Sequence, residues 1–395
     1  MPQPQSPPSD LPRGRSRSRA RLIAVGALAV TLAAAPLLPR GGPEPAIVPS
    51  GDRAAPAAPG TVTPEMRAEI EAVVGDGLAA GRLPARPTVD ALAERLVRCA
   101  DLGPERYCLH TGFTTATETV AQDRVAATAR VEAARPAAQE STGELTTLAA
   151  LRRTAGLDPA ERADRERREL LAAARAVGKV AELRQAVGAD ASTASTARAA
   201  RTKRFRDYPR RSTVLRPKRV REQVRSYWCG PATMQMIAWG WQDRPKPQRH
   251  WSRKLGTTTN GSSVWDMVRV INAATGYDRD AYAGDYVVLD ISDWTYRQWL
   301  LLNMRHIADY RAPLVLHPML HKRFFPYLDD DASGHFQVGR GYDKRGDKPA
   351  HVGYFEPWNQ QRFDPSEPYI ARVQWRSAYR SYRANLAHPQ QNIGV

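Results

Sequence analysis

Hydrophobic and polar residues are distributed differently in the two halves of the chain. Residues 61–200 are dense in Ala, Leu, Arg and Glu, the composition of amphipathic helices. Thr63, Thr88 and Asp158 each stand where a helix would need a capping side chain, and proline follows Thr63 and Asp158 at the first helical position. We therefore expect an all-helical region over residues 61–200. No residues in it suggest a catalytic role, because its acidic residues are interleaved with arginine as on a solvated helix face.

From residue 223 onward the pattern is mixed, and every tryptophan of the chain lies in this part, which predicts a separate domain with its own core. Three helices are predicted: one after Cys229, one in "SSVWDMVRVINAATG" with Ser262 or Ser263 as its cap and Gly276 as its stop, and one over residues 295–310. Short strand-like runs follow: "APLVLH", "HFQVGRGYD", "HVGYFEP" and "IARVQW". Helices followed by strands predict an α+β domain over residues 223–395, whose sheet packs against the cysteine helix.

The remaining segments are predicted to be a signal and two linkers. Residues 1–40 carry an Arg-rich stretch followed by the apolar "LIAVGALAVTLAAAPLL", the order of an export signal that is either cleaved or kept as an anchor. Residues 41–60 are rich in Pro, Ala and Gly and read as a linker. Residues 201–222 form a basic linker. We expect an exported protein, secreted or associated with the cell envelope.

The charge of the chain limits the classes of partner that it is expected to bind. The formal net charge is +17, which attracts acidic surfaces. The densest basic run covers residues 201–225 and fits a solvated linker, a contact with an anionic cell-wall polymer, or a site of proteolytic maturation. Nucleic acid is not expected for an exported chain, and membrane contact is expected only through an uncleaved signal.

The three cysteines fall into a pair and a single residue. Cys99 and Cys108 are nine residues apart, a separation compatible with a disulfide loop in an oxidising compartment. That pairing leaves Cys229 alone. An odd cysteine in an exported protein indicates a free reactive thiol or a bond to another chain.

The surroundings of Cys229 suggest nucleophilic chemistry. Gly230 and Pro231 follow it, so the thiol stands at a predicted helix N-terminus, where the helix dipole favours a thiolate. A small buried core cysteine would have the same sequence. Gln223, six residues earlier, could donate with the Cys229 backbone N–H to the oxyanion formed when a thiolate attacks a carbonyl, and a surface glutamine is the alternative.

Two further residues complete a candidate triad. His335 opens a strand-like run, which would expose its ring at a strand end as general base and acid; a structural histidine is the alternative. Glu356 ends the next apolar strand. Adjacent strands would bring it close enough to accept a hydrogen bond from the second ring nitrogen of His335.

The order of these motifs resembles papain-like cysteine peptidases of the bacteriocin-processing type, which remove double-glycine leaders. The resemblance covers about residues 223–375: Gln, then "CGPA" six residues on, then Gly-His before a strand ending "GYD", then an acid-Pro-Trp step. It implies a papain-like fold, with Gln223 in the oxyanion hole, Cys229 as nucleophile and His335 as base. The family usually has Asp where this chain has Glu356, so Asn359 or no third residue at all stays open.

These observations together predict an exported cysteine peptidase of the stand-alone branch, because no apolar stretch besides the signal is long enough to span a bilayer. Its substrates would be peptides or proteins. Two alternatives remain: an inactive papain-like peptide-binding module at the cell surface, and a thiol acyltransferase. No cofactor and no metal are expected, since His317 and His321 in "HPMLH" lack a metalloprotease Glu and are separated by Pro318.

Overall fold

The computed structural model describes residues 60–81, 86–134, 141–188, 203–242, 244–345, 350–363, 365 and 369–395. The predicted export signal lies outside them, as does the predicted linker except for Gly60. The described residues belong to one compact unit. None of their helices is both long and apolar enough to cross a membrane.

The predicted helix starts of the N-terminal part are confirmed. Its helices are α1 (Pro64–Ala79), α2 (Val89–Leu96), α3 (Glu118–Ala133), α4 (Thr147–Ala155) and α5 (Pro159–Gly188). The Thr63 hydroxyl caps α1 and the Thr88 hydroxyl caps α2, each by accepting a backbone N–H three residues on. The Asp158 carboxylate accepts the Ala160 N–H in the first turn of α5. Side-chain oxygens therefore satisfy backbone donors that a helix start leaves unpaired.

The expectation of an all-helical region over residues 61–200 is wrong. Three strands lie within it: β1 (Cys99–Leu102), β2 (Glu105–Cys108) and β3 (Gly112–Thr114), paired as an antiparallel ladder. They are only three or four residues long and are surrounded by Ala-rich helices. Strands this short carry too little alternation of polar and apolar residues to stand out from helical neighbours.

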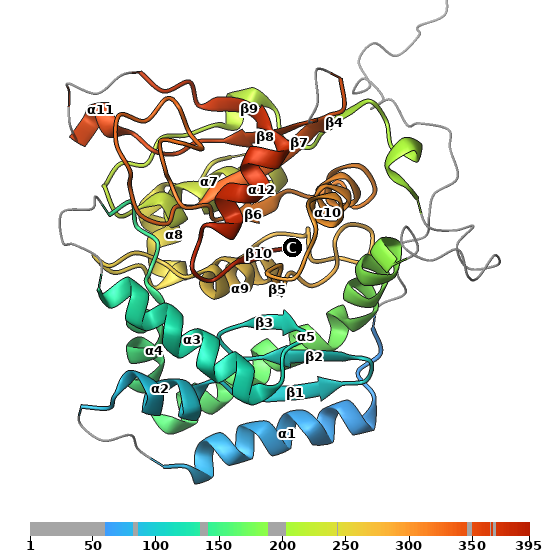
Figure 1. Cartoon of the computed structure of the whole chain (residues 1–395), viewed down its shortest axis with the longest axis vertical. Coiled ribbons are helices and arrows are strands. Elements are labelled where there is room, and N and C mark those ends of the chain that lie inside the picture. Colours follow the sequence, from blue (N-terminus) through green and yellow to red (C-terminus); the bar gives the residue numbers. More distant parts are fainter. Residues whose placement is uncertain are drawn as a thin grey trace, which may run out of the picture. The chain divides into compact units, whose positions relative to one another are not determined.

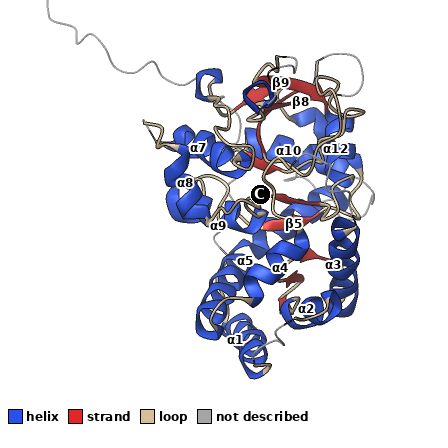
Figure 2. Ribbon diagram, turned by 90° about the vertical axis from the view of Figure 1, so that its left-hand side faces the viewer, coloured by secondary structure: helices blue, strands red, loops and turns tan. Residues whose placement is uncertain are grey.

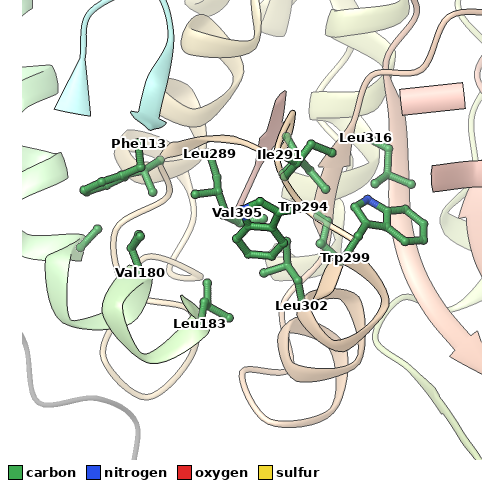
Figure 3. Packing of buried hydrophobic residues seen from close by; sticks show 14 of the residues in the cluster. Phe113, Val180, Leu183, Leu289, Ile291, Trp294, Trp299, Leu302, Leu316 and Val395 are labelled. Atoms are coloured by element: carbon green, nitrogen blue, oxygen red, sulfur yellow. The ribbon is translucent and has the colours of Figure 1, made fainter. Parts of the chain in front are cut away.

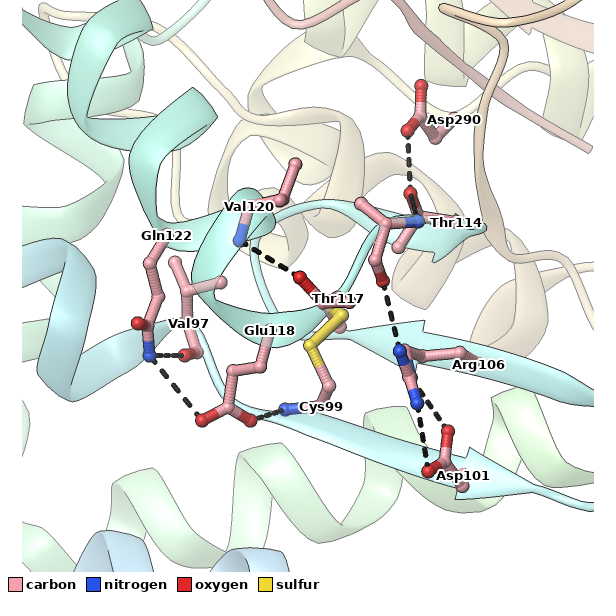
Figure 4. Close-up of a disulfide and its surroundings, with 12 residues drawn as sticks. Val97, Cys99, Asp101, Arg106, Thr114, Thr117, Glu118, Val120, Gln122 and Asp290 are labelled. Carbon is pink, nitrogen blue, oxygen red and sulfur yellow. Dashed lines mark hydrogen bonds and ion pairs between the residues drawn. A yellow bond between two sulfur atoms is a disulfide. The ribbon is translucent and has the colours of Figure 1, made fainter.

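A disulfide bond joins β1 to β2. Cys99 and Cys108 are directly opposed in the ladder and are bonded to each other. Figure 4 shows this bond beside the first turn of α3, where the Glu118 carboxylate accepts the backbone N–H of Cys99 at 2.7 Å. The Cys108 side chain packs into a cluster with residues of α2, α3 and α4. The bond therefore fixes the ladder next to the helices that cover it.

The C-terminal part alternates helices and strands. Its helices are α7 (Cys229–Trp241), α8 (Gln248–Leu255), α9 (Val264–Ala274), α10 (Tyr296–Ala308), α11 (Gln360–Phe363) and α12 (Ala378–Leu386), with two short 3-10 helices, η1 (Phe205–Asp207) and η2 (Pro217–Arg219). Its strands are β4 (Arg211–Thr213), β5 (Val288–Asp290), β6 (Leu314–Leu316), β7 (Gln337–Asp343), β8 (His351–Phe355), β9 (Val373–Ser377) and β10 (Asn392–Gly394). The three predicted helices and four predicted strands are confirmed, and Ser263 rather than Ser262 caps α9. Helices α8, α11 and α12 and strands β4, β5 and β10 were not predicted. Strand β4 lies within residues 201–222 and pairs with β7, so part of the expected basic linker belongs to the sheet.

The strands of both parts form one sheet. Its order is β1-β2-β3-β5-β10-β6-β7-β8-β9, and β4 also pairs with β7 (Figure 1). The pairing of β3 with β5 is parallel, through Phe113 and Leu289, and the other ladders are antiparallel. The architecture is α+β, as predicted. Strands β1 to β3 of the N-terminal part thus extend the sheet of the C-terminal part. Composition had predicted that residues 223–395 form a separate domain, whereas the two parts share this sheet.

Helices cover both faces of the sheet, as Figure 2 shows for α7 to α9 and for α10 and α12. Neighbouring residues of a strand point to opposite faces. Val288 and Val315 therefore pack with α7, α8 and α9, whereas Leu289 and Leu314 pack with α5 and α10. Sequence analysis predicted that the sheet packs against the cysteine helix, and this is confirmed.

The larger hydrophobic cluster crosses from the N-terminal to the C-terminal part. Figure 3 shows Phe113 of β3 and Val180 of α5 in the same cluster as Leu289 of β5 and Trp299 of α10. Burial of such apolar side chains contributes about 25 cal/mol per Å². The same hydrophobic core therefore holds the two parts together.

Candidate active site

Cys229 is the first residue of α7, and its side chain is fully buried. Pro231 fits the first turn, because a proline there has no N–H to leave unpaired. Burial raises the pKa of the Cys229 thiol well above its ordinary value, and the backbone N–H groups of Phe336 and Gly230, which donate to the sulfur, act in the opposite direction. Burial therefore favours the neutral thiol, and two backbone N–H groups are already placed to stabilise a thiolate.

His335 lies immediately before Phe336 and is also fully buried. Its backbone N–H donates to the carbonyl of Pro318 at 3.1 Å, just ahead of β7. Its Nε2 lies 2.7 Å from Oε1 of Glu356, while its Nδ1 has no hydrogen-bond partner among the described residues. One ring nitrogen is thus held by a carboxylate, and the other is left for a proton transfer.

Glu356 follows β8 directly, and its carboxylate accepts four hydrogen bonds. Oε1 accepts from His335 Nε2 at 2.7 Å and from the Trp358 N–H at 2.8 Å, and Oε2 accepts from Gln337 Nε2 at 2.6 Å and from the Tyr327 hydroxyl at 2.8 Å. Burial opposes ionisation, yet His335 and the other donors lower the pKa of this carboxyl below its ordinary value. A buried carboxylate with four donors is charged and rigidly placed.

The pairing of β7 with β8 explains why these two residues meet. Val338 is opposite Phe355 in the antiparallel ladder. Residues just before Val338 therefore lie beside residues just after Phe355, which brings His335 and Gln337 to Glu356. Sequence analysis left Asn359 open as the third residue. In the structure Asn359 Nδ2 donates to the Glu222 carboxylate, and Glu356 is the residue beside His335.

Gln223 lies between the loop that leads to Cys229 and the segment that follows Glu356. Its backbone N–H donates to the Pro357 carbonyl at 2.8 Å. Its Nε2 donates to the carbonyls of Ser226 at 2.7 Å and Arg225 at 3.0 Å, and lies 3.4 Å from the Thr142 carbonyl. The amide that was predicted to serve an oxyanion is thus directed at carbonyl oxygens, one of which belongs to the N-terminal part.

Sequence analysis missed the segment of residues 142–145, which crosses this site. The Thr142 hydroxyl donates to the carbonyl of Gly334, the residue before His335. Ser262 donates its N–H to the Gly143 carbonyl at 3.0 Å and accepts the Leu145 N–H at 2.7 Å. The only local signal was a glycine in "STGELTT" within a region otherwise rich in helix formers.

Glu144 of this segment forms a buried cluster with two histidines. Its Oε1 lies 2.6 Å from His317 Nδ1, its Oε2 lies 3.0 Å from His388 Nε2, and all three side chains are buried. Burial opposes ionisation of Glu144, but the two histidines lower the pKa of its carboxyl to about 2. His321, which sequence analysis considered together with His317, pairs instead with Asp331.

The ligand atoms of Glu144, His317 and His388 lie within 4.8 Å of one another, so this is the set that a metal ion would need. Its hydrogen bonds favour a different account. Gln390 donates its N–H to His388 Nδ1 at 3.1 Å, which places the proton of the neutral ring on Nε2, where it is donated to Glu144. A nitrogen that carries a proton is not a metal ligand. The cluster fits a carboxylate held by two histidines.

Comparison with known proteins agrees with the class of site that the geometry defines. Residues 214–384 match the model of the Peptidase_C39 like family, which points to a cysteine peptidase for this part of the chain. The matched range contains Gln223, Cys229, His335 and Glu356 and leaves out the N-terminal helices. No curated protein and no solved structure matches the chain.

Proposed function

We propose that this protein is an exported, stand-alone cysteine peptidase with a papain-like catalytic domain, in which Cys229 is the nucleophile, His335 the general base and acid, and Glu356 the residue that orients His335. One observation carries the proposal. Glu356 binds Nε2 of His335 and leaves Nδ1 without a partner, and the next residue along the chain, Phe336, donates its backbone N–H to the Cys229 sulfur.

The reaction follows from these contacts. The Cys229 thiol transfers its proton to His335 Nδ1, and the thiolate attacks the peptide carbonyl. Glu356 stabilises the imidazolium, as its four hydrogen bonds keep it ionised and in place. Gln223 would donate to the oxyanion once its Nε2 has turned away from the carbonyls of Thr142, Arg225 and Ser226. His335 then protonates the departing amine, and water hydrolyses the thioester.

Substrates in this proposal are peptides or proteins outside the cell, with no cofactor. Contact with an anionic wall polymer through residues 201–225 also remains a proposal. Within this basic run, Lys203 and Arg211 form ion pairs with Asp309 and Asp343, so part of its charge is used inside the molecule. The remaining exposed arginines of the run would make the polymer contact.

The test is the rate at which iodoacetamide alkylates Cys229 in the whole chain, measured against pH for the wild type and His335→Ala. A rate that persists below the ordinary thiol pKa of about 8.5 and is lost in His335→Ala supports a thiolate–imidazolium pair. The matched control is His321→Ala, which removes a histidine paired with Asp331, outside the site. A rate that does not depend on His335 would refute the proposal.

A peptide-binding module without catalysis is the second candidate, and one observation favours it: Cys229 is fully buried, and burial raises the pKa of its thiol. Incubation of the chain with a peptide library separates the two functions. Cleavage that disappears in Cys229→Ala establishes a peptidase, and mass spectrometry distinguishes hydrolysis from transfer of the acyl group to an added amine.

A further inference from the structure

The segment of residues 142–145 lies against residues that neighbour the proposed nucleophile and base. It contacts Gly334 next to His335, and Gln223, the proposed oxyanion donor. Gly143 has a φ of +102°, and a Cβ on it would come within 2.3 Å of the Tyr227 backbone, two residues before Cys229. Glycine is required for this close approach. The segment therefore passes between the loop of the nucleophile and the loop of the base.

The backbone of this segment is bound by main-chain hydrogen bonds, in the way that an extended peptide binds to the edge of a strand. Ser262 both donates an N–H to the Gly143 carbonyl and accepts the Leu145 N–H, which pairs Glu144 with Ser262 as a parallel β-bridge. Main-chain hydrogen bonds of this kind bind an extended peptide whatever its sequence, and side-chain pockets then select it. Ser262 would offer the same two groups to a substrate if the segment left.

The side chain of Glu144 is buried against His317, His388 and Gly334, and the space that it fills between them is called the His317–His388 pocket below. His317 follows β6, His388 follows α12, and both are buried. A Cβ on Gly334 would lie 2.4 Å from Oε2 of Glu144 and 2.8 Å from Nε2 of His388, so only glycine leaves room for the pair. Nε2 of His317 has no hydrogen-bond partner among the described residues, so Glu144 does not use all the polar groups that this pocket offers.

We propose that the His317–His388 pocket is the subsite of the peptide-binding cleft for an acidic side chain, and that residues 142–145 occupy this cleft as a built-in competitor whose Glu144 takes the place of that side chain. The inference rests on the proposed function for its substrate. Occupation of the cleft by residues 142–145 accounts for the full burial of Cys229, His335 and Gln223. The expected substrates are peptides that carry a carboxylate side chain at the position that Glu144 occupies in the segment.

The experiment measures how fast iodoacetamide alkylates Cys229 in the whole chain at pH 7, read by mass spectrometry. Glu144→Gln keeps the shape of the side chain and removes its charge, so we expect the alkylation rate to rise about tenfold or more. His317→Ala and, as a second variant of the same residue, His317→Gln should raise the rate in the same way. Glu161→Gln and His321→Ala are the matched controls and should leave it unchanged, since Glu161 is exposed and His321 pairs with Asp331.

The acidic subsite is tested by adding peptides to the Glu144→Gln chain. A synthetic "STGELTT" peptide should slow alkylation of Cys229, and the same peptide with glutamine in place of glutamate should need about a tenfold higher concentration for an equal effect. The midpoint of thermal unfolding is measured for each variant, so that opening of the cleft is distinguished from loss of the fold.

Three results would overturn the inference: an unchanged alkylation rate in Glu144→Gln, no protection by either peptide, or equal protection by both. Alkylation by iodoacetamide does not require catalysis, so the two proposals can fail separately. A rate that depends on Glu144 but not on His335 would leave the acidic subsite standing and remove the peptidase mechanism. The reverse result would leave the mechanism and remove the subsite.

Discussion

Replacing Glu356 by glutamine tests the most constrained part of the site. The two oxygens of this carboxylate accept four hydrogen bonds, from His335, Trp358, Gln337 and Tyr327. A glutamine side chain has a single acceptor oxygen, and its NH₂ group can only donate. At most two of the four donors therefore keep an acceptor, and the other two face an N–H.

The expected cost follows from that count. Each buried donor left without an acceptor costs about 1–3 kcal/mol, so Glu356→Gln should lower the free energy of unfolding by about 2–6 kcal/mol. The variant also loses the charge that would stabilise a protonated His335. Alkylation of Cys229 below its ordinary thiol pKa should then fall to the level of His335→Ala.

The assays are chemical unfolding at pH 7 and alkylation of Cys229 against pH. Glu356→Asp is the matched control, because it keeps the charge and both acceptor oxygens on a side chain one methylene shorter, and aspartate is the usual residue in the family that the sequence resembles. It should lose less stability and keep the His335-dependent rate. A loss below about 0.5 kcal/mol in Glu356→Gln, with an unchanged alkylation profile, would refute the assigned role.

Three other predictions concern the N-terminal part. Replacing both Cys99 and Cys108 by serine should lower the free energy of unfolding by about 2.6 kcal/mol in chemical unfolding, the loop-closure entropy expected for a separation of nine residues. Reduction of the disulfide in the wild type should reproduce the loss. The pKa of Glu144 is lowered in the folded state from 4.5 to about 2. Ionised Glu144 therefore contributes about 3 kcal/mol to the free energy of unfolding above pH 4.5, and this contribution is lost as the pH falls toward 2. In Glu144→Gln the free energy of unfolding should change less with pH between these two values. Arg153 of α4 and Arg165 of α5 form ion pairs with the buried carboxylate of Asp266. Burial opposes ionisation of this carboxyl, but the arginines lower its pKa to about 2. Asp266→Asn should therefore weaken the packing of α4 and α5 against α9 and increase their hydrogen exchange.

The sequence predicted the site residues better than their surroundings. Cys229, His335 and Glu356 stand at the ends of elements that local pattern makes visible: a helix start and two strand ends. The hydrogen bond between His335 and Glu356 was predicted from strand adjacency, and the structure contains it. The competing choice of Asn359 could not be decided from spacing, because it depends on which side chain the register of β7 and β8 turns toward the ring.

The amino-acid sequence by itself determined the local elements: capped helix starts, strand-like runs, the odd cysteine and the order of the catalytic residues. Only the tertiary structure decided that β1 to β3 join the C-terminal sheet, and that residues 142–145 lie across the site. Pairing of distant strands depends on backbone groups, which every residue carries alike, so the sequence leaves little trace of it. The His317–His388 pocket is likewise formed by residues from distant segments of the chain. Its proposed role depends on Glu144, which lies 173 residues before His317.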